Sequence, residues 1–157
     1  MQEPFIEKPS LKDIFSLPVL FEKAIVSDFA FYTDMVKKRI LQKNSVHRLF
    51  IARLRKKRIL FVAKINNECV GLIIASHNAN IGIVHWLFVL PQHRSKKIGS
   101  SLLRKAEQSM KDLGCHKITL TTEIASDFYE QLGYVKEGLL KKHWWGQDFA
   151  VMSKVLD

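Results

Sequence analysis

The sequence predicts one α/β (α+β) domain over residues 1–157, built on a mixed, mainly antiparallel sheet of about six or seven strands flanked by helices. Three observations lead to this class. The length suits a single hydrophobic core. Glycine and proline, at 7 and 4 residues, are too sparse to mark a linker. Strand-like runs in the middle of the chain lie between amphipathic helical patterns, which indicates helices packed on a sheet.

The N-terminal part predicts a short strand followed by a helix. Phe5 to Lys8 alternates apolar and polar residues, as a strand does. Ser10 is a suitable N-cap for a helix that begins at Leu11, and Asp13 in its first turn suits the helix dipole. Pro18 is expected to end or kink that helix.

The next stretch predicts a second helix, for which Asp28 is the expected cap. Its apolar residues recur at helical spacing: Phe29, Tyr32, Val36, Ile40 and Leu41. Residues 45–56 allow two interpretations, because their apolar positions fit a helix while strand-like alternation is also arguable.

Three consecutive strands are expected in the middle of the chain. Ile59 to Ile65 and Cys69 to Ser76 form a hairpin joined by Asn66-Asn67, since asparagine tolerates a positive φ. After a turn over His77 to Asn80, Ile81 to Leu90 forms the third strand, which ends before Pro91.

The C-terminal half predicts two helices and three strands. One helix shows an apolar face and a C-terminal glycine at Gly114. Its face is made of Ile98, Leu102, Leu103, Ala106, Met110 and Leu113. The remaining expected elements are a strand over Lys117 to Thr121, a short helix over Ala125 to Leu132 closed by Gly133, and strands over Tyr134 to His143 and Phe149 to Val155.

The net charge of +10 favours an anionic partner, such as a phosphorylated cofactor, nucleic acid or an acidic protein. The densest basic run, Arg53 to Arg58, fits either a solvated helix end or a docking patch for a polyanion.

The sequence gives no sign of a membrane, secretory or metal-binding segment. No apolar run approaches the roughly 18 residues that a membrane span needs, and Met1 to Pro4 does not begin a secretory signal. Cys69 and Cys115 are too few for a disulfide framework or a metal knuckle. We therefore expect a cytoplasmic protein with reduced thiols, no membrane association and no bound metal.

One segment carries a functional signal. The apolar run Leu87 to Val89 leads through a proline loop into Arg94-Ser95-Lys96-Lys97-Ile98-Gly99-Ser100, where a helix begins. The first N–H groups of a helix have no intrahelical partner, so they and the helix dipole bind anions such as phosphate. Gly99 allows a ligand or a neighbouring backbone to approach closely.

This segment resembles the cofactor-binding motif of the GNAT acetyltransferase superfamily. That motif reads Gln or Arg, two residues, Gly, one residue, then Gly or Ala. Arg94 takes the first position and Gly99 the last, whereas Lys97 stands where the first glycine usually is. The backbone N–H of Lys97 is still present to donate.

Two further blocks are similar to the same superfamily. Ala125 to Tyr134 matches its Ala-x-x-Phe-Tyr-x-x-Leu-Gly-aromatic segment, with Thr122 where an asparagine is common. Asp148 to Leu156 resembles the closing strand, through Met152 and Lys154. The resemblance runs from about Phe61 to the C-terminus and implies a GNAT-like fold.

The resemblance also implies a chemistry, transfer of an acetyl group from acetyl-CoA to a primary amine. In it Tyr129 matches the tyrosine that protonates the departing thiolate, and His85 matches a histidine used as general base, placed by strand alternation on the same face as Leu87. Glu123 and Glu130 are alternative carboxylate bases. The residues that the resemblance assigns to the cofactor are Leu87, Phe88, Val89, Arg94, Ser95, Lys96, Lys97, Ile98, Gly99, Ser100, Ser126 and Phe128.

Three functions stay open at this stage. The first is an N-acetyltransferase acting on a peptide, protein or small amine; the second is a GNAT-like sensor that binds acyl-CoA without transfer. The third, less favoured, is a basic nucleic-acid-binding or ribosome-associated protein. His143-Trp144-Trp145-Gly146 fits either a wall of the acceptor site or ordinary packing at a strand end. The acceptor and the choice between monomer and homodimer are left undecided.

Overall fold

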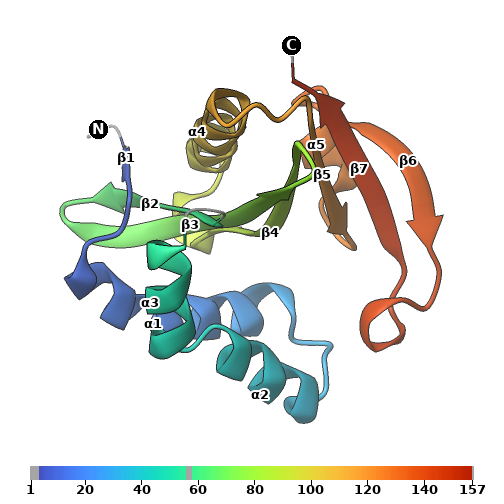
Figure 1. The fold of residues 1–157 in the computed structure, drawn as a ribbon. Helices are drawn as coiled ribbons and strands as arrows, with labels where there is room; N and C mark the ends of the chain where they lie inside the picture. The colour runs from blue at the N-terminus through green and yellow to red at the C-terminus, as the bar shows by residue number, and fades with distance from the viewer. Residues whose placement is uncertain (1–3, 56–57, 157) are drawn as a thin grey trace.

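A computed structural model describes residues 4–55 and 58–156 (Figure 1). Seven strands form one sheet in the order β1-β2-β3-β4-β5-β7-β6. They are β1 (Phe5–Glu7), β2 (Arg58–Ile65), β3 (Glu68–Asn78), β4 (Ile81–Val89), β5 (Lys117–Thr122), β6 (Val135–Leu140) and β7 (Phe149–Val155). All neighbours pair antiparallel except β4 and β5, which are parallel. The mixed, mainly antiparallel sheet predicted from the sequence is confirmed.

Helices cover both faces of this sheet. They are α1 (Leu11–Asp28), α2 (Asp34–Lys43), α3 (Val46–Leu54), α4 (Ile98–Asp112) and α5 (Ser126–Glu130), with short 3₁₀ turns at Pro91–His93 and Trp144–Gly146. Figure 1 shows α1 to α3 on one side and α4 on the other. The predicted apolar face of α4 is buried except for Leu113. No helix in the described part of the chain is long and apolar enough to cross a membrane.

The start of α1 follows the sequence prediction, and its end does not. Ser10 is the N-cap and forms a capping box with Asp13. The helix continues through Pro18 to Asp28, so of the two expected effects, an end or a kink, the first is wrong. Packing explains this result, because Leu17 and Leu20 on either side of Pro18 are both buried in the core.

The prediction that Asp28 caps the second helix is also wrong. Asp28 is the last residue of α1, and α2 begins at Asp34 with Thr33 as its N-cap. Between the helices, Phe29 and Tyr32 form an aromatic stack with ring centroids 5.6 Å apart. The spacing of Phe29 and Tyr32 indicated a helical turn. In the structure these two rings instead pack on each other in the non-helical connection between α1 and α2. The ambiguous stretch after α2 is helical, as α3; Lys56 and Lys57 of the basic run lie outside the described residues.

The hairpin turns agree with the local signals. Asn66 and Asn67 both have positive φ, at 51° and 64°, as a two-residue turn of this type requires. The second turn is shorter than expected, because β3 extends to Asn78 and only Ala79 and Asn80 turn the chain.

The strands β4 and β5 separate along their length. Their pairing covers only Ile81 to Ile83 with Lys117 to Thr119. Beyond that point β4 stays paired with β3, while β5 stays paired with β7. The sheet is thus open between β4 and β5 at the end from which β4 leads toward α4 (Figure 1).

Candidate active site

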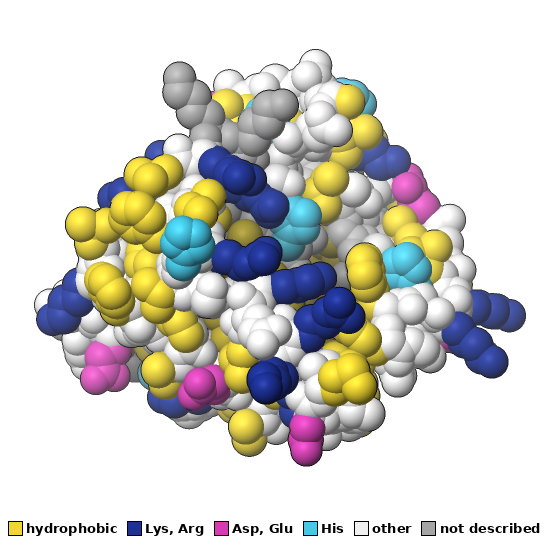
Figure 2. Space-filling view, turned by 60° about the horizontal axis from the view of Figure 1, so that its bottom comes forward, with side chains coloured by type: hydrophobic (Ala, Val, Ile, Leu, Met, Phe, Trp, Pro, Cys, Tyr) yellow, Lys and Arg dark blue, Asp and Glu magenta, His cyan; other side chains and the backbone are white. Residues whose placement is uncertain are grey.

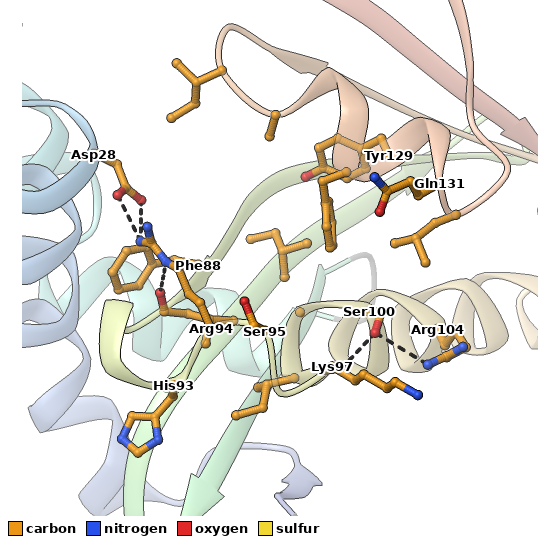
Figure 3. A pocket seen from close by; sticks show the side chains of 18 residues that line it. Asp28, Phe88, His93, Arg94, Ser95, Lys97, Ser100, Arg104, Tyr129 and Gln131 are labelled. Atoms are coloured by element: carbon orange, nitrogen blue, oxygen red, sulfur yellow. Dashed lines mark hydrogen bonds and ion pairs between the residues drawn. The ribbon is translucent and has the colours of Figure 1, made fainter.

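A cavity of about 740 Å³ lies beside the end of β4, between α4 and α5 (Figure 3). Residues from the α1 end, β4, the loop before α4, α4 itself and the α5 region surround it. They are Asp28, Leu87, Phe88, Val89, His93, Arg94, Ser95, Lys97, Ile98, Gly99, Ser100, Arg104, Ile124, Ala125, Phe128, Tyr129, Gln131 and Leu132.

The α4 end of the cavity has the features of an anion site. Lys97 is the N-cap of α4, and the first intrahelical bond runs from the Ser101 N–H to the Lys97 carbonyl. The N–H groups of the first turn therefore have no partner within the helix. Lys97 and Arg104 add positive charge at this end of the cavity.

Lys97 and Ser95 both adopt left-handed backbone conformations, with φ of 59° and 60°. A left-handed conformation is unfavourable for residues other than glycine, asparagine and aspartate. The geometry at Lys97 therefore gives a physical reason why the family motif has glycine there. In this chain a lysine accepts the same backbone conformation and contributes its charge to the cavity wall.

Arg94 faces a different direction from the other basic residues of the segment. Its guanidinium makes two hydrogen bonds to the carboxylate of Asp28, at 2.9 and 2.8 Å, and its Nε donates to the Val89 carbonyl at 3.0 Å. The guanidinium also lies 5.6 Å from the centroid of the Phe88 ring. Arg94 thus ties the end of α1 to the end of β4 across the cavity edge (Figure 3).

Tyr129 brings an ionisable hydroxyl to the opposite wall, on α5. Its ring is buried against Phe128 and Tyr134, with centroids 5.1 and 5.5 Å away. Burial raises the pKa of the phenol above its ordinary value, and no hydrogen bond from a described residue offsets this effect. Figure 3 shows Tyr129 across the cavity from Lys97, Ser100 and Arg104. The site therefore holds a protonated phenol opposite a cationic helix start.

The structure brings eleven of the sequence-predicted residues to this cavity and leaves three outside. Inside are Leu87, Phe88, Val89, Arg94, Ser95, Lys97, Ile98, Gly99, Ser100, Phe128 and Tyr129. Lys96 is exposed outside the lining, and Ser126 is the first residue of α5 without reaching the cavity.

His85 is the third residue outside, and a β-bulge explains its position. The register between β3 and β4 shifts after Ile74–Trp86, so that His85 is an extra residue in β4. Leu87 pairs with Ile73, whereas the His85 Nε2 lies 2.7 Å from the Ser76 Oγ, on the other face of β3. The prediction that alternation puts His85 and Leu87 on the same face is therefore wrong. Burial and the charge of Arg58 lower the pKa of His85.

Seven lining residues were not among the predicted site residues. Ala125, Gln131 and Leu132 lie within the family-like block from Ala125 to Tyr134, so that block contained their signal. Arg104 follows Lys97 by two helical turns on α4, and helical spacing was its signal. The other three, Asp28, His93 and Ile124, have no local signal; Asp28 meets Arg94 across 66 positions of the chain.

Residues 24–134 match the model of the acetyltransferase (GNAT) family, and the chain belongs to that family. The likeness extends to particular members. Over 95 residues, 55% of this chain, it is 32% identical to N-alpha-acetyltransferase 30 of Xenopus laevis and 30% identical to that of Homo sapiens. The match spans only 35% and 26% of the length of these two relatives.

Solved structures of the same class share the fold. The PaiA N-acetyltransferase from Thermoplasma acidophilum, in complex with coenzyme A, superposes with a TM-score of 0.85 at 24% identity, covering 98% of this chain and 99% of that one. The ribosomal-protein-S18-alanine N-acetyltransferase from Escherichia coli gives 0.74 at 13% identity, covering 99% and 95%. These likenesses confirm the predicted GNAT-like fold.

Proposed function

We propose that this protein is an N-acetyltransferase that binds acetyl-CoA in the cavity between α4 and α5 and transfers the acetyl group to a primary amine by direct attack. Membership of the GNAT family supports the activity class. The observation that carries the proposal is the combination, in one cavity, of a cationic helix start at Lys97 and a buried, protonated Tyr129.

The cavity suits the parts of acetyl-CoA. The free N–H groups at the start of α4, with Lys97 and Arg104, offer donors and positive charge to the pyrophosphate. The C-terminal end of β4, from Leu87 to Val89, borders the cavity and offers backbone groups to the pantetheine arm. Phe128 and Leu132 give that arm an apolar wall.

The reaction needs little more than positioning and one proton. The ammonium group of the acceptor first loses a proton to water. The nitrogen of the resulting neutral amine then attacks the thioester carbonyl carbon, the carbon–sulfur bond breaks, and coenzyme A departs as a thiolate. Tyr129 donates its proton to that sulfur and is then reprotonated by the proton that the new amide nitrogen loses. A phenol is protonated at neutral pH, so Tyr129 holds the proton that this step needs.

We also propose a cytoplasmic location. The two cysteines described, Cys69 and Cys115, are both free thiols, as is usual in a reducing compartment. Measuring the oxidation state of both thiols in cells, by alkylation before lysis, checks this placement: alkylated cysteines fit it, and oxidised cysteines contradict it.

Ligand-dependent stabilisation tests the cofactor site. Saturating acetyl-CoA is expected to raise Tm, since a ligand that binds only the folded state stabilises it by RT ln(1 + [L]/Kd). The phosphate-bearing nucleotide adenosine 3′,5′-bisphosphate is a useful control, because it shares phosphates but lacks the pantetheine arm. An unchanged Tm at millimolar acetyl-CoA contradicts the proposal. Binding without thiol release on any amine would instead indicate an acyl-CoA sensor.

A further inference from the structure

Glu123 is a partly buried carboxylate that the cofactor site does not use. It follows the last residue of β5 and directly precedes Ile124 and Ala125, which line the cavity. The hydroxyl of Tyr32 donates to its Oε1 at 2.5 Å. Its Oε2 is buried and has no hydrogen-bond partner within residues 4–55 and 58–156. Because an unpaired buried carboxylate oxygen is costly, this atom indicates a cationic ligand.

Aromatic rings surround the Tyr32 end of this pair. Tyr32 stacks on Phe29, and the rings of Tyr32 and Trp145 meet in a T-shaped arrangement with centroids 5.4 Å apart. Trp145 has a left-handed backbone, with φ of 53°, which is unfavourable for a bulky residue. Such strain is typical of functional segments. Here it places the indole of Trp145 beside Tyr32, the hydrogen-bond partner of Glu123. Aromatic faces attract cations, so these rings suit an ammonium ligand as well.

Three segments far apart in the chain meet here. Tyr32 comes from the connection between α1 and α2, Glu123 from the end of β5, and Trp145 from the connection between β6 and β7. Glu123 follows the part of β5, Leu120 to Thr122, that is not paired with β4. An amine held by Glu123 would therefore lie beside the cofactor cavity, at the open part of the sheet.

Two of the segments that meet at this site lead to exposed cations, which we call the basic rim. Exposed cations stand on α2, at Lys38, Arg39 and Lys43, and on the β6–β7 connection, at Lys141 and Lys142. The Lys43 Nζ lies 5.9 Å from the ring of Trp144, the neighbour of Trp145. Figure 2 shows Lys and Arg side chains crowding the middle of the face that carries α1 to α3. The site thus has an acidic inner end and a basic rim.

We infer that Glu123, beside Tyr32 and Trp145, receives the ammonium group of the acceptor, and that the acceptor carries this one positive charge on an otherwise neutral or acidic molecule, such as a peptide with a free N-terminus followed by acidic residues. This inference rests on the proposed function. The carboxylate complements one ammonium group, while the lysine rim repels further positive charge and attracts negative charge. Polycationic amines are accordingly poor acceptors.

The test compares Glu123→Gln with Glu22→Gln, which removes the same charge from an exposed position on α1. The probe is a peptide beginning Ala-Glu-Glu, titrated into protein saturated with coenzyme A and also used as acceptor with acetyl-CoA. Glu123→Gln is expected to weaken peptide binding and raise its KM by about tenfold to a hundredfold, as the loss of one charge-assisted hydrogen bond implies. The KM for acetyl-CoA is expected to stay within about twofold, and Glu22→Gln is expected to behave as wild type.

Unchanged peptide affinity in Glu123→Gln, with acetyl-CoA still raising its Tm, overturns the role of Glu123. A second measurement needs only the wild-type protein: the Ala-Glu-Glu peptide is expected to bind more tightly than a matched Ala-Lys-Lys peptide and than spermidine. Preference for either polycation overturns the acceptor class. Failure of the proposed function looks different, because wild-type protein would then show no stabilisation by acetyl-CoA.

Discussion

Tyr129 is the residue on which the proposed chemistry depends most. Its hydroxyl makes no hydrogen bond to the described residues, and burial raises its pKa. A phenol is protonated at neutral pH, so Tyr129 has a proton to donate. Tyr129→Phe is expected to lower kcat by about a hundredfold or more, the range for loss of a general acid. Acetyl-CoA affinity and Tm are expected to change little, because no hydrogen bond is lost. Stopped-flow thiol release with a parallel binding titration measures both; a kcat within threefold of wild type would exclude the acid role.

Lys97 combines a favourable charge with an unfavourable backbone conformation. Its φ of 59° costs a lysine about 1 kcal/mol relative to glycine. Lys97→Gly is therefore expected to raise Tm by about 2–4 °C, whereas Lys97→Ala keeps the strain and is expected not to raise it. Both variants lose the charge, so both are expected to bind acetyl-CoA about twofold to fivefold more weakly. Thermal unfolding and calorimetric titration separate the two effects; equal Tm values for the variants would contradict the strain.

A small polar cluster links the start of helix α1 to the sheet. Asp13 closes the capping box with Ser10 and accepts from the Lys64 Nζ on β2 at 2.8 Å, with both side chains mostly buried. Burial tends to raise the pKa of Asp13, but hydrogen bonds from Lys64 and Ser10 outweigh it and lower the pKa below its ordinary 3.8. Asp13 thus links the helix that leads to Asp28 with the edge of the sheet.

Asp13→Asn is expected to destabilise the protein at pH 7 by about 2–4 kcal/mol, since it breaks a buried pair and weakens a cap. Asp34→Asn removes a fully exposed partner of Lys37 and is expected to cost less than about 0.5 kcal/mol. The folded-state pKa of Asp13 is depressed, so its contribution is present above pH 3.8 and is lost as the pH falls through the folded-state value. Urea unfolding at several pH values measures this; a gap between wild type and variant that persists at pH 2 would contradict the assignment.

The elements that were predictable from the sequence carry strong local signals. Ser10 with Asp13, the Asn66-Asn67 turn and the glycine after α4 each determine backbone geometry within a few residues, and the structure confirms them. The elements that were not predictable depend on packing. The passage of α1 through Pro18 and the non-helical segment around Tyr32 are both decided by contacts with other parts of the chain.

The same distinction holds at the site. The motif from Arg94 to Ser100 marks the helix start, and most of its residues line the cavity. The ion pair of Arg94 with Asp28 and the contact of Glu123 with Tyr32 join residues 66 and 91 positions apart, which no local pattern reports. The bulge that turns His85 away from Leu87 depends on the register between β3 and β4, so the local sequence did not predict it either.

At the scale of the whole molecule, charge and topology place the two proposed substrate sites in different parts of the fold. The α4–α5 side of the open sheet offers an anion site, and Glu123, which follows β5 and contacts Tyr32, offers a carboxylate. The net charge of +10 suits an anionic cofactor, and it also suits an acceptor that carries little positive charge. Both substrates are expected to bind more weakly as ionic strength rises, because the rim cations are exposed to solvent.

The central claim, acetyl transfer from acetyl-CoA to an amine, is tested most directly by following the acetyl group itself. Acetyl-CoA carrying a ¹³C-labelled acetyl group is incubated with the protein and the Ala-Glu-Glu peptide, and the labelled carbonyl is observed by NMR. The wild-type protein is expected to move the label from the thioester into an amide, and Tyr129→Phe is expected to do so about a hundredfold more slowly. A label that remains in the thioester, or that is released only as acetate, would contradict the claim.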